Sequence, residues 1–123
     1  MKNTNMTNQE IASRLYELCQ QGQFETAQKE LYANNATSTE SNMQGGRETA
    51  TGIEAIKAKG DKFQSMVEEM HSGYTNEPKV MGNYIFMEMG MDVTMKGMGR
   101  MNMVEMCSYE VKDGKIISEE FYY

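Results

Sequence analysis

Apolar residues along the chain change their spacing once, near residue 66. Before this point they recur every three or four residues, which is typical of amphipathic helices, and after it they alternate with polar residues, which is typical of half-buried strands. The pattern therefore predicts helices first and a sheet afterwards. Helices grouped before an antiparallel sheet indicate an α+β fold in which three N-terminal helices pack on one face of the sheet.

Two helix starts carry capping-box spacing. Thr7 precedes Glu10 by three residues, and Thr51 precedes Glu54 by the same distance. Gly60 weakens the third helix by roughly 1 kcal/mol relative to alanine, but the apolar periodicity around it outweighs this loss. The predicted helices span 8–21, 24–34 and 53–67, with a short strand near 36–41 and a loop before the third helix.

Turn signals divide the second half of the chain into strands. Gly82-Asn83 and Gly97 mark two turns, and Asp113-Gly114 is a strong signal for a two-residue hairpin. Consecutive hairpins imply that neighbouring strands run antiparallel. The predicted strands span 68–77, 84–96, 100–112 and 115–123.

Length and charge narrow the class of protein. The chain has 123 residues, which is enough for one domain over 7–123 after a flexible start at 1–6, and its net charge is −6. This acidic balance argues against nucleic-acid binding, because phosphates are held by clustered basic residues. The sequence shows no membrane-spanning apolar run and no signal-peptide core, so a cytoplasmic protein is expected, with Cys19 and Cys107 as thiols.

Methionine is unusually frequent. Nine of the fourteen methionines lie between residues 81 and 106. In the two longest predicted strands, six of these occupy odd-numbered positions: Met87, Met89, Met91, Met95, Met101 and Met103. Alternation places their thioethers on one face of the sheet. We interpret them as lining a core and an adaptable pocket. The alternative is a soft-metal site for Cu(I), formed by Met87, Met89, Met101 and Met103.

The end of the chain carries a family resemblance. Residues 105–123, with the Asp113-Gly114-Lys115-Ile116 turn, resemble the closing hairpin of the SnoaL-like branch of the nuclear transport factor 2-like superfamily. The segments 46–48 and 52–56 are similar to the Gly-Arg-Glu-Ala-Ile start of that family's third helix, and the order of elements agrees. The resemblance implies a cone-shaped domain whose strongly bent sheet encloses a pocket open at one end. It also implies a homodimer that packs through sheet surfaces. The relatives that it implies include ketosteroid isomerase, polyketide cyclases and scytalone dehydratase.

The candidate site follows from the alternation of side chains along the predicted strands and from this resemblance. Cyclase-like relatives often carry an aspartate where this chain has Cys107, and a thiol is a poor carboxylate substitute. We therefore expect Glu105 and Glu119 to form the acid/base pair, with Tyr109 orienting the ligand and His71 as a further candidate. The residues expected to contact ligand are Met87, Met89, Met91, Met103, Cys107, Phe121 and Tyr123.

The expected function is binding of a hydrophobic small molecule in an apolar pocket. If the protein is an enzyme, the expected reaction is isomerisation, cyclisation or dehydration of a hydrophobic carbonyl compound, without a cofactor or metal. The alternative is a non-catalytic ligand-binding or dimerisation module. In that case Glu105 and Glu119 would form a partly solvated rim or pair with a lysine.

Overall fold

The computed structural model describes residues 6–42 and 44–123. The predicted flexible start at 1–6 lies outside the described residues except for Met6. The elements in chain order are α1 (Asn8–Gln20), α2 (Phe24–Leu31), β1 (Tyr32–Ser41), β2 (Arg47–Thr51), α3 (Ile53–Met66), β3 (Val67–Thr75), β4 (Lys79–Met81), β5 (Tyr84–Met95), β6 (Gly99–Lys112) and β7 (Lys115–Tyr122).

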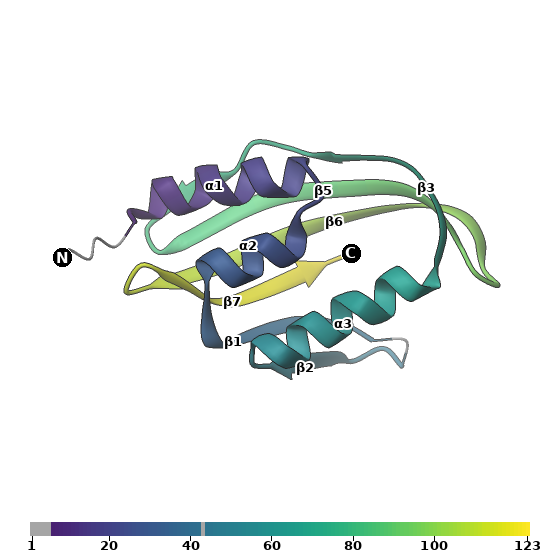
Figure 1. The fold of residues 1–123 in the computed structure, drawn as a ribbon, viewed down its shortest axis with the longest axis horizontal. Helices are drawn as coiled ribbons and strands as arrows, with labels where there is room; N and C mark the ends of the chain where they lie inside the picture. Colours follow the sequence, from purple (N-terminus) through teal and green to yellow (C-terminus); the bar gives the residue numbers. More distant parts are fainter. Residues whose placement is uncertain (1–5, 43) are drawn as a thin grey trace.

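One strongly curled, unclosed sheet holds the helices (Figure 1). Its strand order is β2-β1-β7-β6-β5-β3, and the short β4 pairs with the first residues of β5. The predicted α+β fold, with helices packed in a strongly bent sheet, is confirmed. The sheet is mixed rather than wholly antiparallel, because β1 and β7 run parallel to each other. Among the described residues, no helix has the length and apolar character needed to cross a bilayer.

Helix α1 forms as predicted. The Thr7 hydroxyl accepts the Glu10 backbone amide at 3.1 Å, and the Glu10 carboxylate accepts the Thr7 amide at 2.8 Å. This reciprocal capping satisfies two amides that would otherwise lack partners at the helix start. The apolar stripe of α1 is buried through Ile11, Leu15 and Leu18. The helix is therefore fixed both by its cap and by its contact with the core.

The second predicted capping box is wrong. Helix α3 begins after Gly52, which has φ 94° and no side-chain cap, because Thr51 is used as the last residue of β2 opposite Thr37. Strands β2 and β4 were not predicted. Strand β2 is polar and mostly exposed, so its residues carry no alternation of apolar side chains. Helix α2 also ends earlier than predicted, since β1 starts at Tyr32.

The register between the long strands is as the alternation predicts. Met87 lies opposite Cys107, Met89 opposite Glu105, and Met91 opposite Met103. The Asp113-Gly114 turn between β6 and β7 has positive φ at both residues, 53° and 76°, which is the geometry of a type I′ hairpin. We call the side of the sheet that carries the odd-numbered residues of β5 and β6, and that faces the helices, the inner face.

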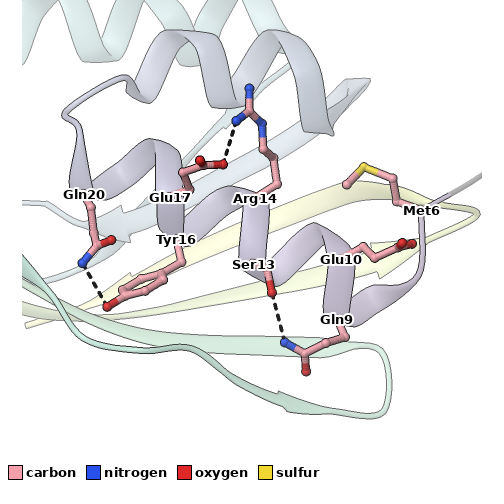
Figure 2. Close-up of a pocket in the computed structure, with 8 residues that line it drawn as sticks. All are labelled: Met6, Gln9, Glu10, Ser13, Arg14, Tyr16, Glu17 and Gln20. Carbon is pink, nitrogen blue, oxygen red and sulfur yellow. Dashed lines mark hydrogen bonds and ion pairs between the residues drawn. The ribbon is translucent and has the colours of Figure 1, made fainter.

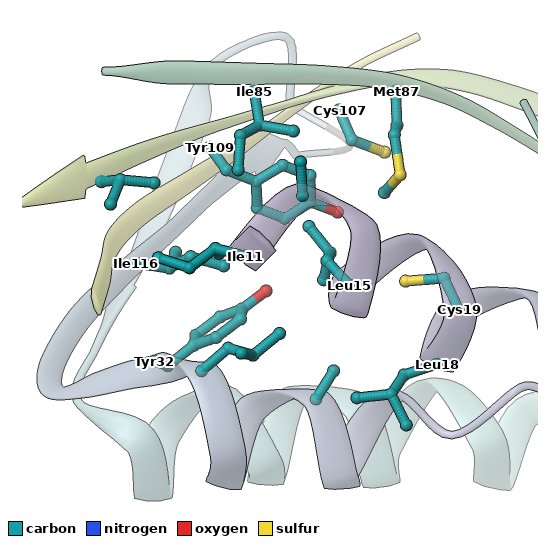
Figure 3. Close-up of a cluster of buried hydrophobic side chains, with 14 of the residues drawn as sticks. Ile11, Leu15, Leu18, Cys19, Tyr32, Ile85, Met87, Cys107, Tyr109 and Ile116 are labelled. Atoms are coloured by element: carbon teal, nitrogen blue, oxygen red, sulfur yellow. The ribbon is translucent and has the colours of Figure 1, made fainter. Parts of the chain in front are cut away.

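The core occupies one end of the curled sheet. Side chains of α1 and α2 pack there against Tyr32, Ile85, Tyr109 and Ile116 (Figure 3). The far ends of β5 and β6 extend past α1 and α2 (Figure 1). The inner face therefore has a packed part under these helices and, beyond it, a half-buried part around Met89, Met91 and Met103, which we call the open part of the inner face.

Candidate functional site

Polar side chains gather on the inner face where the packed part ends. Pairing places Ser38 of β1, Glu119 of β7 and Tyr109 of β6 side by side across the sheet. Glu105 lies further along β6, opposite Met89. Helix α3 adds Lys59 from above β1. We call the group Tyr32, Ser38, Glu40, Lys59, Glu105 and Glu119 the polar cluster.

A bulge in β7 sets the direction of Glu119. Val111 pairs with Ile116, whereas Glu110 pairs with Ser118, so Ile117 is an extra residue. The bulge puts both Ile116 and Glu119 on the inner face despite their different parity. Simple alternation along β7 places Ile117 on the inward face with Glu119, but in the structure Ile116 takes the buried position and Ile117 is only partly buried.

Glu119 is a buried carboxylate with two hydroxyl donors. Its side chain is 4% exposed, and its oxygens accept hydrogen bonds from Tyr32 and, at 2.6 Å, from Ser38. Burial raises the pKa of Glu119, and the two hydrogen bonds oppose this rise by favouring the ionised form. Both carboxylate oxygens are thus engaged and covered, so Glu119 anchors the polar cluster.

Lys59 connects this buried group to the open part of the inner face. Its Nζ donates to Ser38 Oγ at 2.5 Å and lies 3.2 Å from Glu40 Oε2. A lysine ammonium can only donate, so the Ser38 hydroxyl accepts a hydrogen bond from Lys59 and donates one to Glu119. Lys59 also lies 5.2 Å from the centroid of the Phe121 ring. The cluster therefore has a fixed hydrogen-bond direction from Lys59 towards Glu119.

Glu105 lies opposite the half-buried Met89, on the open part of the inner face. It is partly buried, and the Cys107 thiol donates to its Oε1 at 3.8 Å. Burial raises the pKa of Glu105 to about 7, with the nearby Glu40 carboxylate adding to the rise. A carboxyl group that titrates near neutral pH can both accept and return a proton under physiological conditions. Glu105 thus has the properties required of a general acid or base.

Two other candidate residues lie away from Glu105. Tyr109 is 2% exposed and sits in the core beside Tyr32 (Figure 3). His71 contacts Thr94 Oγ1 at 2.8 Å through Nε2 and Glu69 at 3.5 Å through Nδ1. Thr94 alternates with the buried Val93, which places it on the outer face of β5. The structure therefore does not bring His71 to the polar cluster.

The expected ligand contacts divide into three groups. Met87 and Cys107 are fully buried under α1 (Figure 3), whereas Tyr123 is 62% exposed. The half-buried members, which border the open part of the inner face, are Met89, Met91, Met103 and Phe121. The alternative Cu(I) site does not fit this geometry. Met101 pairs with Val93, six residues along β5 from Met87, which corresponds to about 20 Å.

Two hollows of the described surface are found on and beside the helices. One runs along the exposed side of α1 (Figure 2), and the other lies between α3 and β2. Neither includes Glu105 or Glu119. The α1 hollow is lined by Met6, Gln9, Glu10, Ser13, Arg14, Tyr16, Glu17 and Gln20. Where an apolar pocket was expected, the structure has a half-open wall of Met89, Met91, Met103 and Phe121 beside the polar cluster.

Sequence reasoning did not identify Lys59, Ser38, Glu40 or Tyr32. Ser38 and Glu40 alternate along a strand that was correctly expected near 36–41, so their shared face was available as a signal. Lys59 follows buried Ile56 by three residues on α3, the spacing of neighbours on one helix face. Contacts between segments 21 and 81 residues apart leave no local pattern.

Comparison with known proteins identifies the class that this fold and site define. The model of the SnoaL-like domain matches residues 6–123, so the chain belongs to the SnoaL-like family. A comparison with functionally curated proteins gave no match.

Solved structures agree with this family assignment. A protein from Mesorhizobium loti, described as a SnoaL-like polyketide cyclase, is 37% identical, with 96% of this chain and all of that chain covered and a TM-score of 0.88. A ketosteroid isomerase-like protein from Catenulispora acidiphila, in complex with trimethylamine, is 21% identical over 95% of this chain and 87% of that chain, with a TM-score of 0.70. TerC, co-crystallised with polyporic acid, is 17% identical over 94% and 90% of the two chains, with a TM-score of 0.72.

Proposed function

We propose that this protein binds a hydrophobic carbonyl compound on the half-open part of the inner face and moves a proton next to its carbonyl group. The observation that carries the proposal is Glu105, a partly buried carboxyl group with a pKa raised to about 7. Met89 lies directly opposite it on β5, and Phe121 lies opposite its neighbour Cys107 on the same face. Such a group can remove a proton from carbon and return it elsewhere, which is the common step of isomerisation, cyclisation and dehydration.

The surroundings support this assignment. Half-buried methionines provide an apolar and adaptable surface for a ring-shaped ligand. Two proteins of the same fold carry small molecules, trimethylamine in one and polyporic acid in the other. The proposal includes a cytoplasmic location, since Cys19 and Cys107 are buried free thiols, as is usual in a reducing compartment. Proton transfer of this kind requires positioned groups rather than a cofactor.

Replacing Glu105 by glutamine is expected to slow proton transfer by about a hundredfold, the usual contribution of a general acid or base. The reaction is followed by NMR as exchange of the α-hydrogens of a cyclic ketone such as 2-tetralone for deuterium. The matched control is Glu110→Gln, because Glu110 lies on the same strand but pairs with Tyr84 on the outer face. Equal exchange rates for Glu105→Gln and the wild type, with both folded, would contradict the proposal.

A second function is favoured by the outer face of the sheet. Val104 is 53% exposed, Met106 44% and Tyr122 45%, and Met106 lies directly opposite Tyr122. Apolar side chains gathered on one face of a sheet are typical of a contact between proteins. We propose that this face forms a homodimer through sheet surfaces.

Introducing a charge into this face is expected to dissociate the dimer, because Val104→Glu would bury a carboxylate without a partner at the contact. Sedimentation velocity at micromolar concentration should show a dimer for the wild type and a monomer for the variant. Thr49→Glu, on the exposed edge strand β2, is the control and should remain dimeric. A monomeric wild type would remove this proposal.

A further inference from the structure

Lys59 has more donors than the polar cluster uses. A lysine ammonium carries three N–H groups. Ser38 Oγ accepts one at 2.5 Å, and Glu40 Oε2 lies 3.2 Å away to accept a second. Within residues 6–42 and 44–123, the structure gives Nζ no third acceptor. The same ammonium lies 5.2 Å from the centroid of Phe121, a half-buried ring that borders the open part of the inner face.

Proton removal next to a carbonyl creates a need for such a donor. The electron pair of the broken C–H bond moves onto the carbonyl oxygen, and a hydrogen-bond donor placed at that oxygen lowers the barrier. Other donors in the cluster are already used. Tyr32 and Ser38 donate to Glu119, and the Cys107 thiol donates to Glu105. Lys59 therefore remains as a donor of the cluster, near enough to Glu105 for its charge to lower the pKa of that carboxyl group.

We propose that Lys59 binds the negatively charged oxygen of the ligand while Glu105 holds the proton. This inference rests on the proposed function and specifies its ligand as a compound with an acidic oxygen, an enolate or a phenolate. The charges balance, because Glu105 becomes neutral when it accepts the proton and the ligand oxygen becomes negative. One negative charge thus moves from the Glu105 carboxylate to a position beside the Lys59 ammonium.

The remaining charges make binding of such an anion depend on protonation. The groups that face Glu105 are Glu40 of β1, Lys59 of α3, Glu119 and Tyr123 of β7, and Cys107 of its own strand. Two of these are carboxyl groups that repel an anion. An anionic ligand is accommodated once Glu105 is neutral, so a phenol that binds should transfer its proton to Glu105.

The test uses 4-nitrophenol, because its absorbance distinguishes the phenol from the phenolate. In the wild type, the bound molecule is expected to be the phenolate at a pH where the free molecule is largely neutral. Lys59→Met is expected to bind it at least tenfold more weakly, and Lys59→Arg, which retains the charge, to keep most of the affinity. Lys62→Met is the matched control, since Lys62 is exposed one turn further along α3.

Several outcomes would overturn the inference. These are absence of binding to the wild type, binding of neutral 4-nitrophenol only, or unchanged phenolate affinity in Lys59→Met. The first two need no variant, so they decide the matter even if Lys59→Met does not fold. Failure of the proposed function looks different. In that case 2-tetralone exchange is unaffected by Glu105→Gln, while binding of the phenolate still depends on Lys59.

Discussion

Glu119→Ala is expected to lower the free energy of unfolding by about 4 kcal/mol, within the range for removing one partner from a buried polar network. The variant leaves the Tyr32 and Ser38 hydroxyls without their acceptor in a region that excludes water. It also leaves a space where the carboxylate was. Lys59 then has no buried negative group at the end of its hydrogen-bond path.

Urea unfolding followed by circular dichroism measures this effect. The matched control is Glu120→Ala, the next residue along β7, whose carboxylate forms a half-exposed ion pair with Arg47 at 3.3 Å. An exposed pair of this kind contributes at most about 1 kcal/mol. If the two variants lost the same small amount of stability, Glu119 would not anchor the polar cluster.

Stability is expected to fall by about 3 kcal/mol as the pH rises from about 4.5 to about 7, through Glu105 alone. The folded-state pKa of Glu105 is about 7, above its ordinary value of 4.5, because burial disfavours the charged form. Between these two values the folded protein binds more protons than the unfolded chain. The contribution is therefore fully present below the lower value and is lost as the pH approaches the upper one.

The measurement is the free energy of unfolding at several pH values for the wild type and for Glu105→Gln. Glutamine does not titrate, so the difference between the two proteins should change with pH by this amount. Glu119, whose pKa is also raised by burial, contributes in the same direction to both proteins and cancels in the comparison. Parallel stability curves would show that Glu105 titrates as an ordinary exposed carboxyl group.

Local patterns were sufficient to predict the helices and the long hairpins. The alternation of Met87, Met89 and Met91 with polar residues determined which side of β5 faces the helices, and Asp113-Gly114 determined the register of the last hairpin. These features depend on neighbouring residues and on hairpin geometry. The resemblance of residues 105–123 also identified the SnoaL-like family, which the match over residues 6–123 shows.

The composition of the site depended on contacts that no local pattern encodes. The bulge at Ile117 changes which β7 residues face inward, and alternation alone cannot locate an extra residue. Lys59 reaches Ser38 only because α3 crosses over β1. Met87 and Cys107 were assigned to a ligand surface because the sequence does not reveal how far α1 extends over the sheet. Which residues of the inner face are buried and which are open depends on how the helices pack on the sheet.

The extra residue in β7, Ile117, also separates the part of the strand that packs in the core from the part that contacts the polar cluster. Before it, Ile116 belongs to the hydrophobic interior. After it, Glu119 and Phe121 contact the polar cluster through Ser38 and Lys59. The pairing register shifts at this extra residue. Substitutions among the apolar residues before it therefore leave the direction of the side chains after it unchanged. In proteins descended from this sequence, stability and ligand selectivity can therefore change through separate mutations within the eight residues of β7, Lys115–Tyr122.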